Sequence, residues 1–197
     1  GGGRGRMLEE KLIRIMRTYP PFERDLERVR LLRLPDGCIA AGYVRNYVWD
    51  FLHGYERRTP LNDADVIYYD PDDLREETEK KYEQELRHQL PEYNWSCKNQ
   101  ARMHLVKGHR PYSSVEDAMR RWPETATAVG VRLDWNGNIQ VVAPHGLEDL
   151  FSLVIRRSPL FKDEQYFRAR IQRKRWLELW PGLRVVDEDL TDNRRDR

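Results

Sequence analysis

The sequence has few cysteines and no long apolar run. Cys38 and Cys97 both lie among apolar residues and lack the spacing of metal ligands, so we expect two buried thiols in a reducing compartment. No apolar stretch approaches the roughly 20 residues that span a bilayer. The beginning of the sequence also lacks the apolar stretch and cleavage site of a signal peptide. We therefore expect a soluble, cytoplasmic protein with no membrane partner.

An excess of charge of one sign is missing as well. Lys and Arg number 35 and Asp and Glu number 33 among 197 residues, a net charge of +2, so the total charge gives no general reason to expect nucleic-acid binding. One local exception is a basic cluster between residues 168 and 175, with Tyr166, Phe167 and Trp176 beside it. We interpret it as a solvated helix face, with contact to a nucleic-acid backbone as the alternative.

The length fits one α/β domain with a buried core. We predict a flexible start at residues 1–6, a single domain over residues 7–186 and a polar, disordered tail over residues 187–197. Hydrophobic periodicity predicts helices over residues 7–17, 22–32, 43–53, 74–90 and 161–180, and a shorter one that Ser113 or Ser114 caps and that extends to Trp122. Strands are predicted over residues 38–41, 65–69, 93–98, 129–135 and 139–143. The order favours an α+β (α/β) fold in which helices pack on a mixed β-sheet.

An acidic pair, Asp63 and Asp65, leads into the strand pattern that ends at Tyr69. Residues i and i+2 of a strand point to the same face, so the two carboxylates would repel each other unless a cation lay between them. Mg²⁺ prefers such oxygen ligands and shares its coordination shell with substrate phosphates, and Mn²⁺ is the alternative ion. We take both residues as candidate metal ligands and catalytic residues.

The Asp-x-Asp spacing alone is weak evidence. It occurs three times among the sixteen aspartates, and random placement would give about one occurrence. The pair Asp70/Asp72 brackets a proline in a predicted turn, and Asp187/Asp189 lies in the polar tail. Only the first pair runs directly into a strand, and this context singles it out.

A second candidate element is the turn from the strand that ends at Ala41, through Gly42, into the next helix. Such a turn lets backbone N–H groups and the positive end of the helix approach a phosphate. Arg45 and Asn46 follow in the first turn of that helix, where a cation opposes the helix dipole and a triphosphate or a carboxylate would compensate it. The alternative is an ordinary tight turn with a surface arginine.

The order of these elements resembles the polymerase-β-like nucleotidyltransferases, and the chain closely resembles one bacterial family of that superfamily from about Leu8 to Leu183. The resembling segments are Ala41-Gly42-Tyr43-Val44-Arg45-Asn46 with Trp49-Asp50, Pro60-Leu61-Asn62-Asp63-Ala64-Asp65-Val66, Lys98-Asn99-Gln100-Ala101-Arg102-Met103-His104, Arg121-Trp122-Pro123-Glu124-Thr125-Ala126-Thr127-Ala128 and Ala143-Pro144-His145-Gly146-Leu147-Glu148-Asp149-Leu150. The resemblance implies the nucleotidyltransferase fold and Mg²⁺-dependent transfer of a nucleoside monophosphate from an NTP to an acceptor hydroxyl. The sequence leaves the acceptor (RNA, protein or a small molecule) and the oligomeric state open.

The third of these segments is dense in side chains that contact nucleotides. Its functional interpretation makes Lys98 and Arg102 phosphate partners and Asn99 a ribose or base contact. The alternative is a solvated strand end at which Asn99 caps the following turn. The resemblance to the family is strongest in this segment. For that reason we give the functional and the structural interpretation equal weight.

One departure from the family pattern concerns catalysis. Polymerase-β-like enzymes place a third carboxylate on a later strand, whereas the corresponding stretch here has Ser96. A serine cannot act as a base near neutral pH, and we consider Asp134 and Glu92 as substitutes. Two alternatives to an active enzyme remain: an inactive nucleotide- or nucleic-acid-binding protein of the same fold, and a regulatory or toxin–antitoxin partner.

Overall fold

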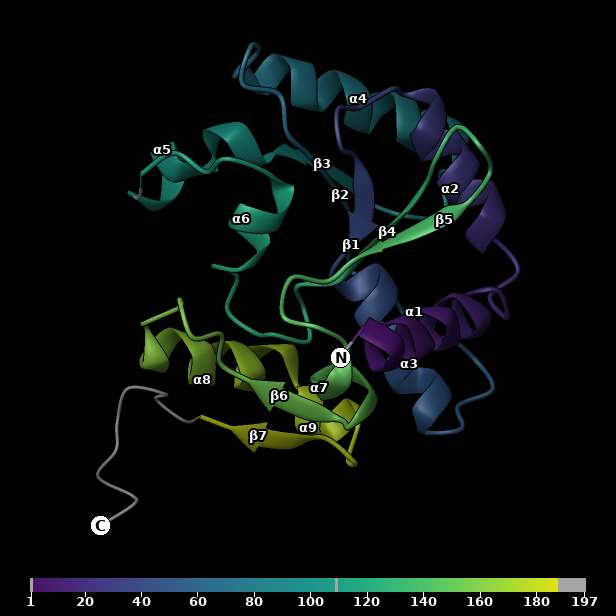
Figure 1. Cartoon of the computed structure of the whole chain (residues 1–197), viewed down its shortest axis with the longest axis vertical. Coiled ribbons are helices and arrows are strands. Elements are labelled where there is room, and N and C mark those ends of the chain that lie inside the picture. Colours follow the sequence, from purple (N-terminus) through teal and green to yellow (C-terminus); the bar gives the residue numbers. More distant parts are fainter. Residues whose placement is uncertain (1, 109, 188–197) are drawn as a thin grey trace.

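A five-stranded mixed sheet forms the centre of the protein (Figure 1). The computed structural model describes residues 2–108 and 110–187. The sheet consists of β1 (Cys38–Ala40), β2 (Ala64–Tyr68), β3 (Trp95–Asn99), β4 (Gly130–Leu133) and β5 (Ile139–Val142). In the order β3-β2-β1-β4-β5, only β2 and β3 are parallel neighbours, and the other pairs are antiparallel. The predicted α+β fold with a mixed sheet is confirmed.

The longer helices of the first half follow the predicted apolar stripes. They are α1 (Gly2–Met16), α2 (Phe22–Leu31), α3 (Gly42–Leu52) and α4 (Glu76–Gln89). Short turns of helix follow as η1 (Gln100–Arg102), α5 (Met103–Lys107), α6 (Val115–Met119) and α7 (Glu148–Phe151). The first turns of α1 include residues that the sequence assigns to a flexible start. Beyond Asp187, the predicted disordered tail lies outside the described residues.

The last part of the chain differs from the sequence prediction. The single helix expected over residues 161–180 is divided into α8 (Glu164–Lys174) and α9 (Trp176–Leu179), because Arg175 adopts a left-handed backbone conformation with φ 56°. A small parallel sheet of β6 (Val154–Arg156) and β7 (Arg184–Val186) was not predicted. Figure 1 shows both helices and this small sheet together, on the side of the molecule away from α4.

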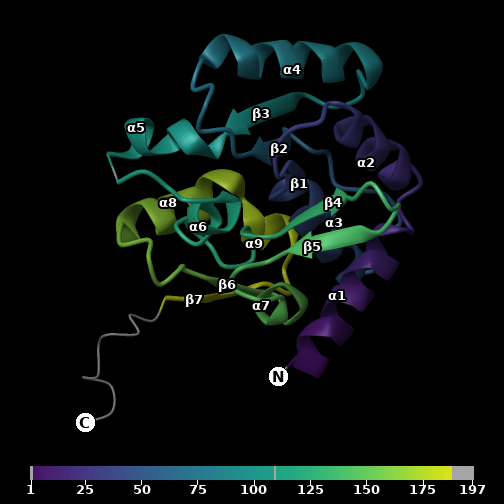
Figure 2. The same cartoon turned by 45° about the horizontal axis from the view of Figure 1, so that its top comes forward.

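Apolar side chains cover both faces of the central sheet. Ile39 and Val66 join the larger core with residues of α1–α4, whereas Cys38 and Ile67 join a smaller core with α6. Because side chains alternate along a strand, Asp65 lies on the same face as Ile67. Helix α4 packs along β3 at one edge of the sheet (Figure 2). No helix in the described part of the chain is both long and apolar enough to span a bilayer.

Candidate functional site

Five of the predicted site residues line one cleft of 140 Å³ between α3, the start of β2 and the C-terminal helices. These residues are Gly42, Arg45, Asn46, Asp63 and Asp65. The cleft is also lined by residues of the C-terminal helices and the segment after them: Arg170, Lys174, Trp176, Leu179 and Trp180. The structure therefore brings the acidic pair and the Gly42 turn together, as the sequence predicted.

The two carboxylates of the acidic pair have different surroundings. Asp63 is exposed immediately before β2, and its Oδ1 accepts a hydrogen bond of 2.6 Å from Asn94. Asp65 is half-buried within β2. Burial, followed by the charge of Asp63, raises the pKa of the Asp65 carboxyl, and the cations Arg45, Lys174 and Arg170 only partly oppose this effect. The folded protein therefore disfavours the charged form of Asp65.

The turn before α3 has a strained backbone. Ala41 has φ 57°, a left-handed conformation that alanine rarely adopts, and it provides no side-chain cap for the helix. Its carbonyl accepts from the N–H groups of Val44 and Arg45. The N–H groups of Gly42 and Tyr43 have no acceptor within the helix and are available to an external one. A Cβ on Gly42 would lie 3.2 Å from Arg45 Nη2, so glycine makes room for that guanidinium.

Arg45 is buried rather than on the surface. Its Nη1 donates to Thr127 Oγ1 at 2.9 Å, its Nε donates to Asn46 Oδ1 at 3.0 Å, and the guanidinium lies 4.6 Å from the centre of the Trp176 ring. Burial and then the charge of Arg170 lower the pKa of Arg45 to about 10. The fold thus holds this cation rigidly beside the acidic pair.

The sequence interpretation did not assign Glu124 or Arg170 to the site. Glu124 is fully buried, and its carboxylate accepts from Arg170 Nε at 2.8 Å and from Thr127 Oγ1 at 2.5 Å. Thr127 in turn accepts from Arg45, so one buried carboxylate fixes two arginines of the cleft. The only sequence signal was the family-like string around Glu124, to which no role was given.

Asp50, a residue of α3, binds two chain segments that line the cleft. It is 2% exposed, and its carboxylate accepts from the Thr59 N–H at 2.7 Å and from the Thr59 hydroxyl at 2.6 Å. It also accepts from Trp180 Nε1 at 2.8 Å. The loop before Asp63 and the segment after α9 are therefore tied to the same buried side chain.

Three residues that the sequence assigned to nucleotide binding lie elsewhere. Lys98 is 3.4 Å from Glu83, and Arg102 makes a bidentate ion pair with buried Glu79. The side chain of Asn99 accepts from the N–H groups of residues 70 and 101 and donates to the carbonyls of residues 70 and 73. Lys98, Asn99 and Arg102 do not line the cleft. Asn99 caps the following turn as the structural alternative expected, but Asn99 and Arg102 are buried rather than solvated.

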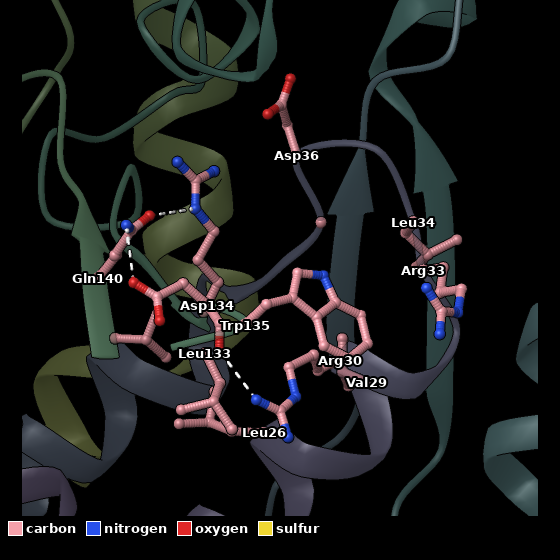
Figure 3. Close-up of a pocket in the computed structure, with 13 residues that line it drawn as sticks. Leu26, Val29, Arg30, Arg33, Leu34, Asp36, Leu133, Asp134, Trp135 and Gln140 are labelled. Atoms are coloured by element: carbon pink, nitrogen blue, oxygen red, sulfur yellow. Dashed lines mark hydrogen bonds between the residues drawn. The ribbon is translucent and has the colours of Figure 1, made fainter. Parts of the chain in front are cut away.

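The candidates for a third carboxylate also lie away from the acidic pair. Ser96 is the β3 residue paired with Asp65. Asp134 is at the turn between β4 and β5, where its carboxylate accepts from the N–H groups of residues 136 and 138, and it lines a different pocket beside Trp135 and Arg30 (Figure 3). Glu92 pairs with Arg24. Within residues 2–108 and 110–187, no group of three or more His, Cys, Asp and Glu residues is suited to bind a metal.

Comparisons with known proteins identify relatives of the whole domain. Residues 27–185 match the family described as nucleotidyltransferase. A structure described as revealing "a CCA-adding enzyme head domain" is 34% identical with a TM-score of 0.75, covering 88% of this chain and 95% of that one. No curated protein matches this chain.

Two more distant structures share the fold. A CCA-adding enzyme in complex with CTP is 15% identical, with a TM-score of 0.53 and coverage of 90% of this chain and 43% of that one. The Thermotoga maritima CCA-adding enzyme in complex with tRNA is 16% identical, with a TM-score of 0.51 and coverage of 86% and 38%. This chain thus spans less than half of either enzyme. From the match over residues 27–185, together with the shared head-domain fold, the chain belongs to the nucleotidyltransferase family of the polymerase-β-like superfamily.

Proposed function

We propose that this protein transfers a nucleoside monophosphate from an NTP to an acceptor hydroxyl in a Mg²⁺-dependent reaction. The observation that carries the proposal is the convergence in one cleft of the acidic pair, the N-terminus of α3 and three cationic side chains. Such a cleft suits a ligand with both a divalent ion and several phosphates. Membership of the nucleotidyltransferase family supports the same reaction class.

The residues present fit a hard divalent cation. The donors are carboxylate oxygens, and burial together with the Asp63 charge raises the pKa of Asp65, so a cation between the two would relieve an existing repulsion. Asp63 and Asp65 would hold Mg²⁺, or Mn²⁺ as an alternative. Bound there, the ion would neutralise charge on the phosphates and polarise the reacting phosphoryl group.

The other residues of the cleft bind and orient the nucleotide in this proposal. The N–H groups of Gly42 and Tyr43 donate to the phosphate oxygens at the positive end of α3. Arg45, fixed by Thr127 and Trp176, offers a preorganised charge to the phosphoryl oxygens. The amide of Asn46, also in the cleft, is free to donate to the ribose or base.

The comparison with the head domain indicates which donor and acceptor to test first. Because the 34% identical structure is described as the head domain of a CCA-adding enzyme, CTP and ATP are the first donors to test, and RNA is the first acceptor. The cytoplasmic location and the domain limits at residues 7 and 186 remain predictions.

The second candidate function is nucleotide binding without turnover. The observation in its favour is Ser96, which is paired with Asp65 where a third carboxylate would be expected. A serine hydroxyl can hydrogen-bond an acceptor hydroxyl but cannot take up its proton near neutral pH. An enzyme releases pyrophosphate when CTP or ATP and RNA are supplied together, whereas a binding protein does not.

The acidic pair can be tested by Mg²⁺-dependent binding of CTP and ATP. We expect the double variant Asp63→Asn, Asp65→Asn to lose at least about a hundredfold in affinity while it stays folded. The matched control is Asp70→Asn, Asp72→Asn, which removes the same charge at the same spacing from a turn outside the cleft. Equal affinity of the two double variants would refute the assignment of the site.

A further inference from the structure

Helix α8 turns one face of its basic sequence towards the cleft. Arg170 and Lys174 are four residues apart, so they lie on the same side of the helix, and both line the cleft. Arg168 belongs to a different face, where it is exposed and pairs with Glu164. The basic cluster is therefore only in part the solvated helix face that the sequence suggested.

The two cleft cations of α8 differ in how they are held. Arg170 is bound to the buried Glu124 carboxylate, and its guanidinium also lies 5.5 Å from the centre of the Trp176 ring. Lys174 is half-buried, and no carboxylate among the described residues lies within ion-pair distance of its ammonium. Lys174 is thus a cleft cation with a flexible side chain and three N–H donors available.

The surroundings of Lys174 disfavour its charge in the absence of a ligand. Burial lowers the pKa of its ammonium, and the neighbouring cations Arg170, Arg45 and Arg173 lower it further, whereas Asp65 raises it. A solvated helix face would not produce this effect, because water screens exposed charges. Cations held together at one side of a cleft provide favourable energy for an anion of high charge density.

Different residues of the cleft would contact different phosphates of the nucleotide. Under the proposed function, the acidic pair and Arg45 lie at the phosphate where the nucleotide is cleaved. Lys174 lines the same cleft from α8. A nucleoside monophosphate needs only the first set of contacts, whereas a triphosphate brings further negative charges that need a cation beyond them.

We propose that Lys174 binds the terminal phosphates of the nucleotide and is the residue by which the cleft selects triphosphates over monophosphates. The proposal rests on the proposed function for the nucleotide, although the cationic wall can be tested without it. Glu124 acts as the positioning residue, because it fixes Arg170 next to Lys174 and, through Thr127, fixes Arg45.

The test is to measure the affinities for CTP, CMP and inorganic tripolyphosphate by calorimetry. We expect Lys174→Gln to weaken CTP and tripolyphosphate binding by about tenfold or more and to leave CMP binding within twofold, because one charged hydrogen-bond donor is lost. Lys174→Arg keeps the charge and should retain most of the triphosphate preference. Arg168→Gln, on the same helix and with the same change of net charge, is the control and should change none of the three affinities.

The outcomes separate this inference from the proposed function. Unchanged CTP binding in Lys174→Gln, or equal weakening of CTP and CMP binding, would overturn the role of Lys174 and leave the proposed function standing. Lys174-dependent binding of tripolyphosphate without binding of any nucleotide would support the role and refute the proposed function. Circular dichroism of each variant tests whether a loss of binding comes from a loss of folding. Retained binding in Lys174→Arg would show independently that the fold tolerates a substitution at this position.

Discussion

The two ends of the parallel pair β2–β3 form two polar regions that differ in how their charged side chains are paired. At one end Asp65 is beside Ser96, and at the other Tyr68 is beside Asn99. The second end contains Lys98, Asn99 and Arg102, whose residue types suit nucleotide contacts, and the sequence favoured that role and a structural one equally. Only the first opens into the cleft.

What separates the two regions is compensation of charge. At the Asn99 end, Glu79 accepts from the Asn99 N–H at 2.6 Å and pairs with both sides of the Arg102 guanidinium, so each charge has a partner. At the Asp65 end, burial and then like-charged neighbours raise the pKa of Asp65 and lower the pKa values of Arg45 and Lys174. A binding site here is distinguished by charge that the protein leaves uncompensated rather than by its residue types.

The largest effect on stability is expected when a buried charge partner is removed at the Asn99 end. Glu79→Ala leaves Arg102 and the Asn99 N–H without their buried partner, so we expect a loss of about 3–5 kcal/mol in the free energy of unfolding, measured in urea. Glu76→Ala is the control, since that carboxylate is exposed and lies 3.5 Å from Arg102. Nucleotide affinity of the folded variant should not change, and a specific loss of affinity would argue that the two ends act together.

A smaller effect on stability, of opposite sign, is expected from a substitution at the Asp65 end. Because the pKa of Asp65 is higher in the folded protein than in the unfolded chain, its ionisation destabilises the fold. Asp65→Asn should therefore gain about 1 kcal/mol at neutral pH, a rise of a few degrees in the melting temperature.

The pH dependence gives the sign check for Asp65. Stability of the wild type should fall, relative to Asp65→Asn, as pH rises from the ordinary Asp pKa of about 3.9 through the raised value of Asp65. Below that window the two proteins should be equally stable. Asp72→Asn, at an exposed turn, serves as the comparison, and a destabilised Asp65→Asn at neutral pH would show that its cationic neighbours outweigh burial and repulsion.

The smallest effect sharpens the contrast between two lysines. Lys98 is 44% exposed at its side chain and forms a long ion pair with Glu83, so Lys98→Gln should change stability by less than about 0.5 kcal/mol and leave CTP affinity within twofold. Lys174→Gln serves as the comparison in the same titration. If Lys98→Gln lost affinity tenfold, Lys98 would return as a phosphate contact.

Much of the fold was predictable because each helix and strand of the central sheet has its own local pattern. β4 and β5 pair as a hairpin within the two strands predicted over residues 129–135 and 139–143, and Ser114, one of the two predicted caps, caps α6 through the Asp117 N–H. The break at Arg175 had no local signal, because neither glycine nor proline stands there. Directly after the break, the Trp176 ring packs 4.6 Å from the Arg45 guanidinium and 5.5 Å from that of Arg170, contacts that no local pattern indicates.

The candidate site was predictable only for the part that is near in sequence. Gly42 and Arg45 are on α3 and Asp65 is on β2, the next element along the chain. The order of these motifs therefore indicated that the three residues share one cleft. Lys174 reaches the cleft, and Glu124 reaches the arginines of the cleft, only through the folding of distant segments. Asn99 shows the converse: its residue type suits a ligand, but its backbone neighbours use all of its hydrogen-bonding capacity.

The position of Trp176 gives the cleft an optical reporter of its own. Its indole ring lies 4.6 Å from the Arg45 guanidinium carbon and 5.5 Å from that of Arg170. An anion bound beside these guanidinium groups changes the electric field across the ring, and with it the emission of the indole. Occupancy of the cleft can therefore be followed in the unlabelled protein, and a Trp176→Phe variant identifies which part of the signal arises there.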